Sequence, residues 1–79
     1  MSYQGTVEQW IELGTETREV YKAVLHLLNS SGEIMTKSDL AELDKAYQSM
    51  LRFKGHAENV MLKQHPDMDK AKAFAVFFG

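Results

Sequence analysis

Hydrophobic positions in the first third of the chain recur with the period of an amphipathic α-helix. The apolar residues of this stretch are Val7, Trp10, Ile11, Leu13, Val20, Tyr21, Val24, Leu25, Leu27 and Leu28. Their spacing predicts a helix, because a strand would alternate with a period of two. Thr6 and Gln9 have the spacing of a capping box at its start. Residues 29–32, which are Asn-Ser-Ser-Gly, favour a left-handed conformation that closes the helix soon after Leu28.

A second apolar pattern of the same period ends at the single proline. Its positions are Leu40, Leu43, Ala46, Tyr47, Met50, Leu51, Phe53, Ala57, Val60, Met61 and Leu62. Thr36 and Asp39 have capping-box spacing, and Met35 and Leu40 stand at the positions of a hydrophobic staple. Because the residue before a proline is pushed away from helical geometry, the helix should end at His65 after about 28 residues.

The last stretch of the chain predicts a short third helix. Pro66 suits the first helical position, and Asp67 and Asp69 suit the opening turn. Its apolar face would be Ala71, Phe74, Phe77 and Phe78. We therefore expect an all-α fold, with a long antiparallel helical hairpin followed by a short C-terminal helix.

The hairpin has one register that brings apolar residues together. Residues at the same level of an antiparallel pair have numbers with a constant sum, here about 68. The expected pairs are Leu28 with Leu40, Leu25 with Leu43, Tyr21 with Tyr47, and Thr17 with Leu51. The same register should bring Glu12 close to Lys54 and Glu16 close to Arg52. Such pairs would join the acidic first half of the chain to the more basic stretch 45–65.

Length and composition limit the class of protein. The chain has 79 residues, a net charge of −2 and no cysteine, which is consistent with one small domain over residues 1–79. Disulfides, thiolate zinc sites and cysteine nucleophiles are therefore excluded. A core this small gains from reinforcement, and self-association would provide it. No apolar run approaches the ~20 residues of a membrane span. The first residues lack a signal-peptide pattern, so we expect a cytoplasmic protein.

No motif of the chain indicates catalysis. The sequence contains no nucleophile elbow, no glycine-rich phosphate loop and no Glu-x-x-His metal pair, so we expect no catalytic, cofactor-binding or metal-ligating residues and no enzyme. Gly14 and Gly55 fall at one level of the expected hairpin. Together with Trp10 and His56 they would form either a close approach of two backbones or a notch for a ligand.

Two further features allow alternative functions. Lys45, Arg52 and Lys63 share one side of the second helix, and this basic patch would suit a nucleic-acid-binding regulator. His65-Pro66-Asp67 resembles the tripeptide that J-domain co-chaperones carry between their second and third helices. This resemblance covers three residues and implies a co-chaperone-like module. A helix that starts with proline and has aspartates in its first turn explains the same residues.

The main functional prediction comes from an excess of apolar positions. Leu13, Val20 and Leu27 lie beside the stripe that the hairpin itself would bury, and Phe53, Val60 and Met61 repeat this on the second helix. Two hairpins packed into a four-helix-type bundle would bury these positions. The alternative is a three-helix monomer closed by the C-terminal helix. We therefore expect a self-associating, non-catalytic regulator, inhibitor or adaptor that binds another protein. Aromatic residues dominate such interfaces, and the candidates are Trp10, Phe74, Phe77 and Phe78.

Overall fold

The protein is entirely helical in the part of the chain that the computed structural model describes, residues 4–79. Three helices follow one another, α1 (Val7–Ser31), α2 (Ala41–Gln64) and α3 (Lys70–Phe78), and no strand occurs in this range. The predicted all-α class is confirmed. Within residues 4–79, no helix combines the length and the apolar character that crossing a membrane requires.

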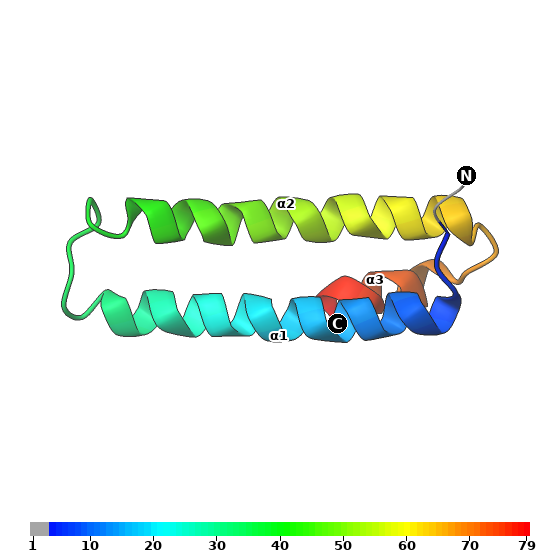
Figure 1. The fold of residues 1–79 in the computed structure, drawn as a ribbon, viewed down its shortest axis with the longest axis horizontal. Coiled ribbons are helices and arrows are strands. Elements are labelled where there is room, and N and C mark those ends of the chain that lie inside the picture. Colours follow the sequence, from blue (N-terminus) through cyan, green and yellow to red (C-terminus); the bar gives the residue numbers. More distant parts are fainter. Residues whose placement is uncertain (1–3) are drawn as a thin grey trace.

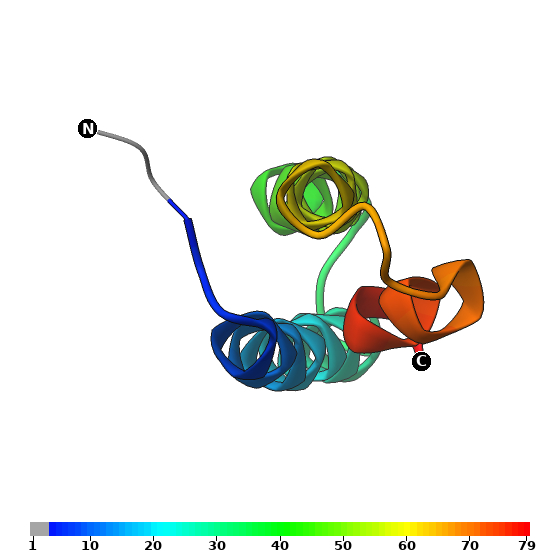
Figure 2. The ribbon, with the colours of Figure 1, turned by 90° about the vertical axis from the view of Figure 1, so that its right-hand side faces the viewer.

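The two long helices lie side by side and run in opposite directions, and α3 returns along one end of them (Figure 1). Seen along the helices, α3 lies on one side of the layer formed by α1 and α2 and contacts both of them (Figure 2). The molecule measures 46 × 24 × 17 Å. Because α3 is short, it covers only the part of the layer that contains the start of α1 and the end of α2.

Helix α1 begins as the sequence predicts and ends differently. The Gln9 N–H donates to Thr6 Oγ1 at 3.1 Å, and the Thr6 N–H donates to Gln9 Oε1 at 2.8 Å, so the capping box is confirmed. The helix continues to Ser31. The expected left-handed closure is wrong, because Gly32 has right-handed angles (φ −61°, ψ −18°) and its N–H still donates to Leu28 O at 2.9 Å.

The predicted cap of the second helix exists, but it closes a separate turn. The Asp39 N–H donates to Thr36 Oγ1 at 3.3 Å, and the Thr36 N–H donates to Asp39 Oδ2 at 3.2 Å. The backbone then departs from helical geometry at Leu40 (φ −90°, ψ 0°), and α2 begins at Ala41. The helix therefore has 24 residues, fewer than expected, because the capped turn does not continue into it.

The third helix starts later than predicted, so the placement of Pro66 at its first position is wrong. The chain leaves α2 at His65 (φ −132°, ψ 70°) and makes a turn in which the Met68 N–H donates to His65 O at 3.1 Å. Asp69 then caps α3 by accepting the Lys72 N–H at 3.3 Å. A side-chain acceptor therefore starts this helix, and the proline belongs to the preceding turn.

Burial is confined to the part of the layer that α3 covers. Phe77, Met61 and Ala73 are completely buried, and Ala57 nearly so. The expectation that Met61 lies on a second apolar stripe is therefore wrong. The half-buried side chains packed against this core are Trp10, Leu62, Met68, Val76 and Phe78. No residue from 18 to 53 is buried. The other part of the molecule is therefore a layer of two helices whose apolar side chains are half-buried or exposed.

Candidate functional site

Two of the four aromatics predicted to form an interface hold the single chain together. Phe77 has no exposed surface, and the Trp10 ring meets it edge-on with centroids 6.2 Å apart. The Trp10 indole N–H donates to Gln64 Oε1 at 2.9 Å, and the same oxygen accepts the Gly5 N–H at 2.9 Å. Phe77 is therefore part of the core of one chain, and Trp10 ties the start of α1 to the end of α2.

The other two aromatics form a stack on α3. The rings of Phe74 and Phe78 lie 5.0 Å apart and nearly parallel, at 13°. Phe78 is half-buried, whereas Phe74 is 54% exposed. Of the four aromatic candidates, Phe74 alone presents most of its side chain to the outside.

A tyrosine pair marks the register of the two long helices. The hydroxyls of Tyr21 and Tyr47 are 2.8 Å apart, and their rings are stacked with centroids 5.3 Å apart. This is the contact that the sequence predicts for the two residues. Burial and the hydrogen bond with Tyr47 raise the pKa of the Tyr21 phenol, with the hydrogen bond as the larger cause.

Lys54 lies beside this pair and is buried without a carboxylate partner. Its Nζ is 3.9 Å from the centroid of the Tyr21 ring and 4.6 Å from that of Phe78. Such cation–π contacts stabilise an ammonium group that has lost its water. The expected pairing of Glu12 with Lys54 is therefore wrong. The reason is α3, whose Phe78 covers Lys54 and turns it into a core residue.

We expect the Lys54→Met variant to be more stable than the wild-type protein at pH 7. Burial lowers the pKa of Lys54 below 10.5, and the charge of Arg18 lowers it further, so the folded state disfavours the charged form. The unfolded chain therefore binds this proton more tightly than the folded chain does. As the pH rises toward 10.5 the proton is lost, and the free energy of unfolding of the wild-type protein increases. The advantage of the variant should accordingly shrink between pH 7 and pH 10. Urea unfolding at both pH values measures this, and a variant less stable at pH 7 would contradict it.

Gly14 and Gly55 do not form a shared notch. A Cβ atom on Gly14 would overlap the backbone carbonyl and side chain of Val76, whereas a Cβ atom on Gly55 would meet nothing within 4 Å. His56 is exposed. The absent side chain of Gly14 therefore allows α3 to approach α1, and the close approach expected between α1 and α2 occurs between α1 and α3.

The cations of the predicted basic patch lie on the outer side of α2. Lys45, Arg52 and Lys63 are exposed, and their spacing places them opposite the buried Met61. Lys45 Nζ is 3.4 Å from Glu42 Oε1, which is the one ion pair among residues 4–79. Arg52 donates to Ser49 Oγ at 3.2 Å. The expected pairing of Glu16 with Arg52 inside the chain is therefore wrong.

The His65-Pro66-Asp67 tripeptide lies at the end where α2 turns into α3. His65 Nε2 is 2.7 Å from Gly5 O, so the imidazole is tied to the segment before α1. Pro66 and Asp67 are exposed. Sequence reasoning did not anticipate that Gln64 and His65 both hold this N-terminal segment, because nothing local in the pattern brings positions 5 and 64 together.

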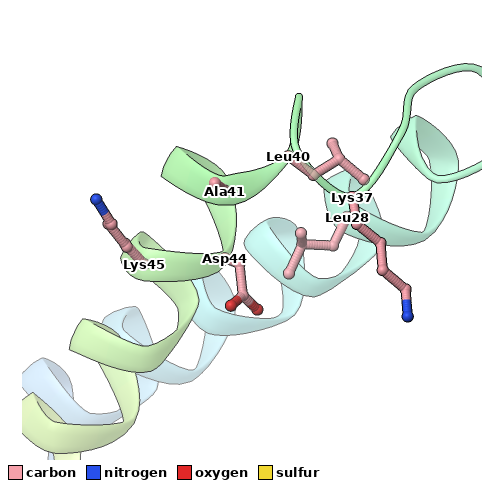
Figure 3. Close-up of a pocket in the computed structure, with 6 residues that line it drawn as sticks. All are labelled: Leu28, Lys37, Leu40, Ala41, Asp44 and Lys45. Atoms are coloured by element: carbon pink, nitrogen blue, oxygen red, sulfur yellow. The ribbon is translucent and has the colours of Figure 1, made fainter.

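A pocket of about 470 Å³ opens near the connection between α1 and α2 (Figure 3). Leu28 of α1 and Leu40, which precedes α2, form its apolar wall. The sequence predicts that these two residues lie at the same level of the hairpin. The ammonium group of Lys45 points away from both leucines (Figure 3). This pocket lies in the half of the molecule where no residue is buried.

A stripe of exposed apolar side chains runs along the layer, and we call it the apolar seam. It consists of Leu13 (38% exposed), Val20 (50%) and Leu27 (51%) of α1 and Phe53 (43%) of α2. The three α1 residues are seven apart and therefore share one side of the helix.

The apolar seam faces away from α3. Leu13 precedes Gly14, and Phe53 precedes Lys54; Gly14 and Lys54 contact α3. One step along a helix is a rotation of about 100°. Figure 2 shows α3 on one side of the layer. Because α1 and α2 run in opposite directions, one step back along each chain turns both side chains away from that side, toward the opposite face of the layer.

Comparison of the chain with protein-family models, with curated proteins and with solved structures finds no match.

Proposed function

We propose that this is a non-catalytic helical protein that acts by protein–protein interaction, as a regulator, inhibitor or adaptor, and that it self-associates through the apolar seam. The observation that carries the proposal is the seam itself. Leu13, Val20, Leu27 and Phe53 share one face of the layer, and each is more than one third exposed. Large apolar side chains grouped on one face are typical of an interaction surface, whereas single exposed ones are common on any protein.

The total surface supports the same proposal. The chain has an accessible surface of 5900 Å² and a mass of 9.0 kDa. A compact monomer of this mass would expose about 4900 Å². A standard interface removes about 800 Å² from each partner. The excess of roughly 1000 Å² is therefore close to what one copy contributes to a stable dimer.

The shape leads to the same conclusion. The Cα radius of gyration is 15.1 Å, whereas a compact domain of this length would have about 12 Å. Two layers packed seam to seam would form a four-helix bundle, which buries a second apolar stripe on every helix. In such a bundle the short α3 of each copy remains on the outside, where it covers the other face of its own layer.

We expect the Val20→Glu variant to lose self-association while it keeps its fold. Val20 is half exposed in the single chain, so a carboxylate there costs little in a monomer. At the centre of an apolar interface the same carboxylate would be buried without a partner, which is strongly unfavourable. Sedimentation equilibrium should show that the dissociation constant of the variant rises by about a hundredfold or more.

The matched control is Ile34→Glu, which adds the same charge at an apolar position outside the seam. Ile34 lies between α1 and α2 and is 81% exposed. Its variant should associate like the wild-type protein. Equal losses in both variants, or none in Val20→Glu, would contradict the role of the seam.

A further inference from the structure

Opposite charges border the apolar seam on its two helices. On α1 the border is acidic: Glu16 lies one turn from both Leu13 and Val20, and Glu12 precedes it by one turn. On α2 the exposed cations Lys45, Arg52 and Lys63 lie on the outer side of the helix, next to the side that carries Phe53, and Glu42 lies among them. We call these the acidic edge and the basic edge.

The two edges are not paired with each other inside one chain. Among residues 4–79 the one ion pair joins Lys45 to Glu42, so Glu12 and Glu16 have no cation within ion-pair distance. Arg52 reaches only the neutral hydroxyl of Ser49. The acidic edge therefore lacks a counter-charge, and a second copy can supply one from its basic edge.

Glu16 and Arg52 lie at the same level of the layer. The contact between Tyr21 and Tyr47 fixes the level of the two helices. Glu16 precedes Tyr21 by as many residues as Arg52 follows Tyr47. Both residues therefore lie the same number of residues from the tyrosine pair, toward the end of the layer that α3 covers. An arrangement that places α1 of one copy over α2 of another at equal height therefore brings these two side chains together.

We propose that a second copy of the chain docks on the apolar seam, related to the first by a two-fold axis parallel to the helices. This inference rests on the self-association proposed above and adds its geometry. In this arrangement α1 of each copy lies over α2 of the other, and neighbouring helices are antiparallel throughout. Glu16 of each copy faces Arg52 of the other, and the acidic edge runs along the basic edge.

The charges favour this arrangement over the other two-fold stacking of two identical layers, in which the axis is perpendicular to the helices. A two-fold axis perpendicular to the helices would place α1 over α1 and bring the two acidic edges together. Like charges facing each other disfavour a complex and suppress wrong arrangements. The parallel axis instead matches acid with base on both sides of the interface, as a self-complementary two-fold contact requires.

Charge reversal tests the geometry through the mixing of two variants. In Glu16→Lys alone, a lysine of each copy would face Arg52 of the other, and in Arg52→Glu alone two carboxylates would face each other. Each variant by itself should dimerise about tenfold or more weakly than the wild-type protein. A mixture of the two variants restores opposite charges at both contacts, so a heterodimer should form with near wild-type affinity. Native mass spectrometry at low salt resolves the three species.

Stronger association of the mixture cannot come from contacts inside one chain. Each variant chain still carries two like charges at positions 16 and 52, whether or not the other variant is present. The control pair is Glu33→Lys and Lys37→Glu, which lie between the long helices and should change nothing when separate or mixed. If Val20→Glu abolishes association while the charge variants associate normally and show no preference for the heterodimer, the two-fold arrangement is wrong and the proposed function stands. If the wild-type protein does not associate, both are wrong.

Discussion

Replacing Phe77 by alanine should lower the free energy of unfolding by about 3–5 kcal/mol, the range typical of a buried phenylalanine. The side chain is completely buried, contacts the Trp10 ring edge-on and forms the core with Met61 and Ala73. Without the ring, α3 loses its largest buried side chain against the long helices. Chemical unfolding followed by circular dichroism measures the loss.

Phe74→Ala is the matched control, because it removes the same ring from the same helix. Phe74 is 54% exposed and stacks on Phe78 alone, so its loss should cost about 1 kcal/mol or less. Similar losses in the two variants would mean that α3 does not pack through Phe77.

The second large effect is expected at Gly14. Alanine is favoured over glycine by about 1 kcal/mol inside a helix. A methyl group at Gly14 would nevertheless overlap the backbone carbonyl of Val76, so α3 would have to move away from α1. We expect Gly14→Ala to destabilise the protein by about 1–3 kcal/mol, as overpacked cores do. The same unfolding experiment measures it.

Gly55→Ala is the same substitution, but we expect it to change the free energy of unfolding in the opposite direction. Gly55 lies inside α2, and a Cβ atom there would meet nothing within 4 Å. The variant should therefore gain about 0.5–1 kcal/mol from its higher helix propensity. If Gly14→Ala also gains stability, the close approach between α1 and α3 is not a feature of the folded protein.

The features predicted correctly from the sequence depend on local chemistry or on one regular pattern. The Thr6 cap depends on neighbouring residues only, and the Tyr21–Tyr47 contact follows from matching two periodic stripes. The start of α3 was missed because Pro66 and Asp69 both carry N-terminal signals, and the turn closed by His65 decides between them. Competing local signals are resolved by the surrounding structure.

The candidate site was predictable only where α3 plays no part. The spacing of Leu13, Val20 and Leu27 already indicates a second apolar stripe, and these side chains are exposed in the structure. The roles of Phe77 and Lys54 depend on where α3 docks, which the amphipathic pattern does not specify. A lysine that looks like a surface charge in the pattern is therefore buried under Phe78.

The most direct test of the proposed self-association is the mass of the wild-type chain measured by light scattering over a range of micromolar concentrations. Two copies joined along the apolar seam should give about twice 9.0 kDa. Because a ligand that binds only the folded state stabilises it, and the second copy acts as such a ligand, the melting temperature should rise with protein concentration. A mass of 9.0 kDa at every concentration, with a constant melting temperature, would contradict the proposal.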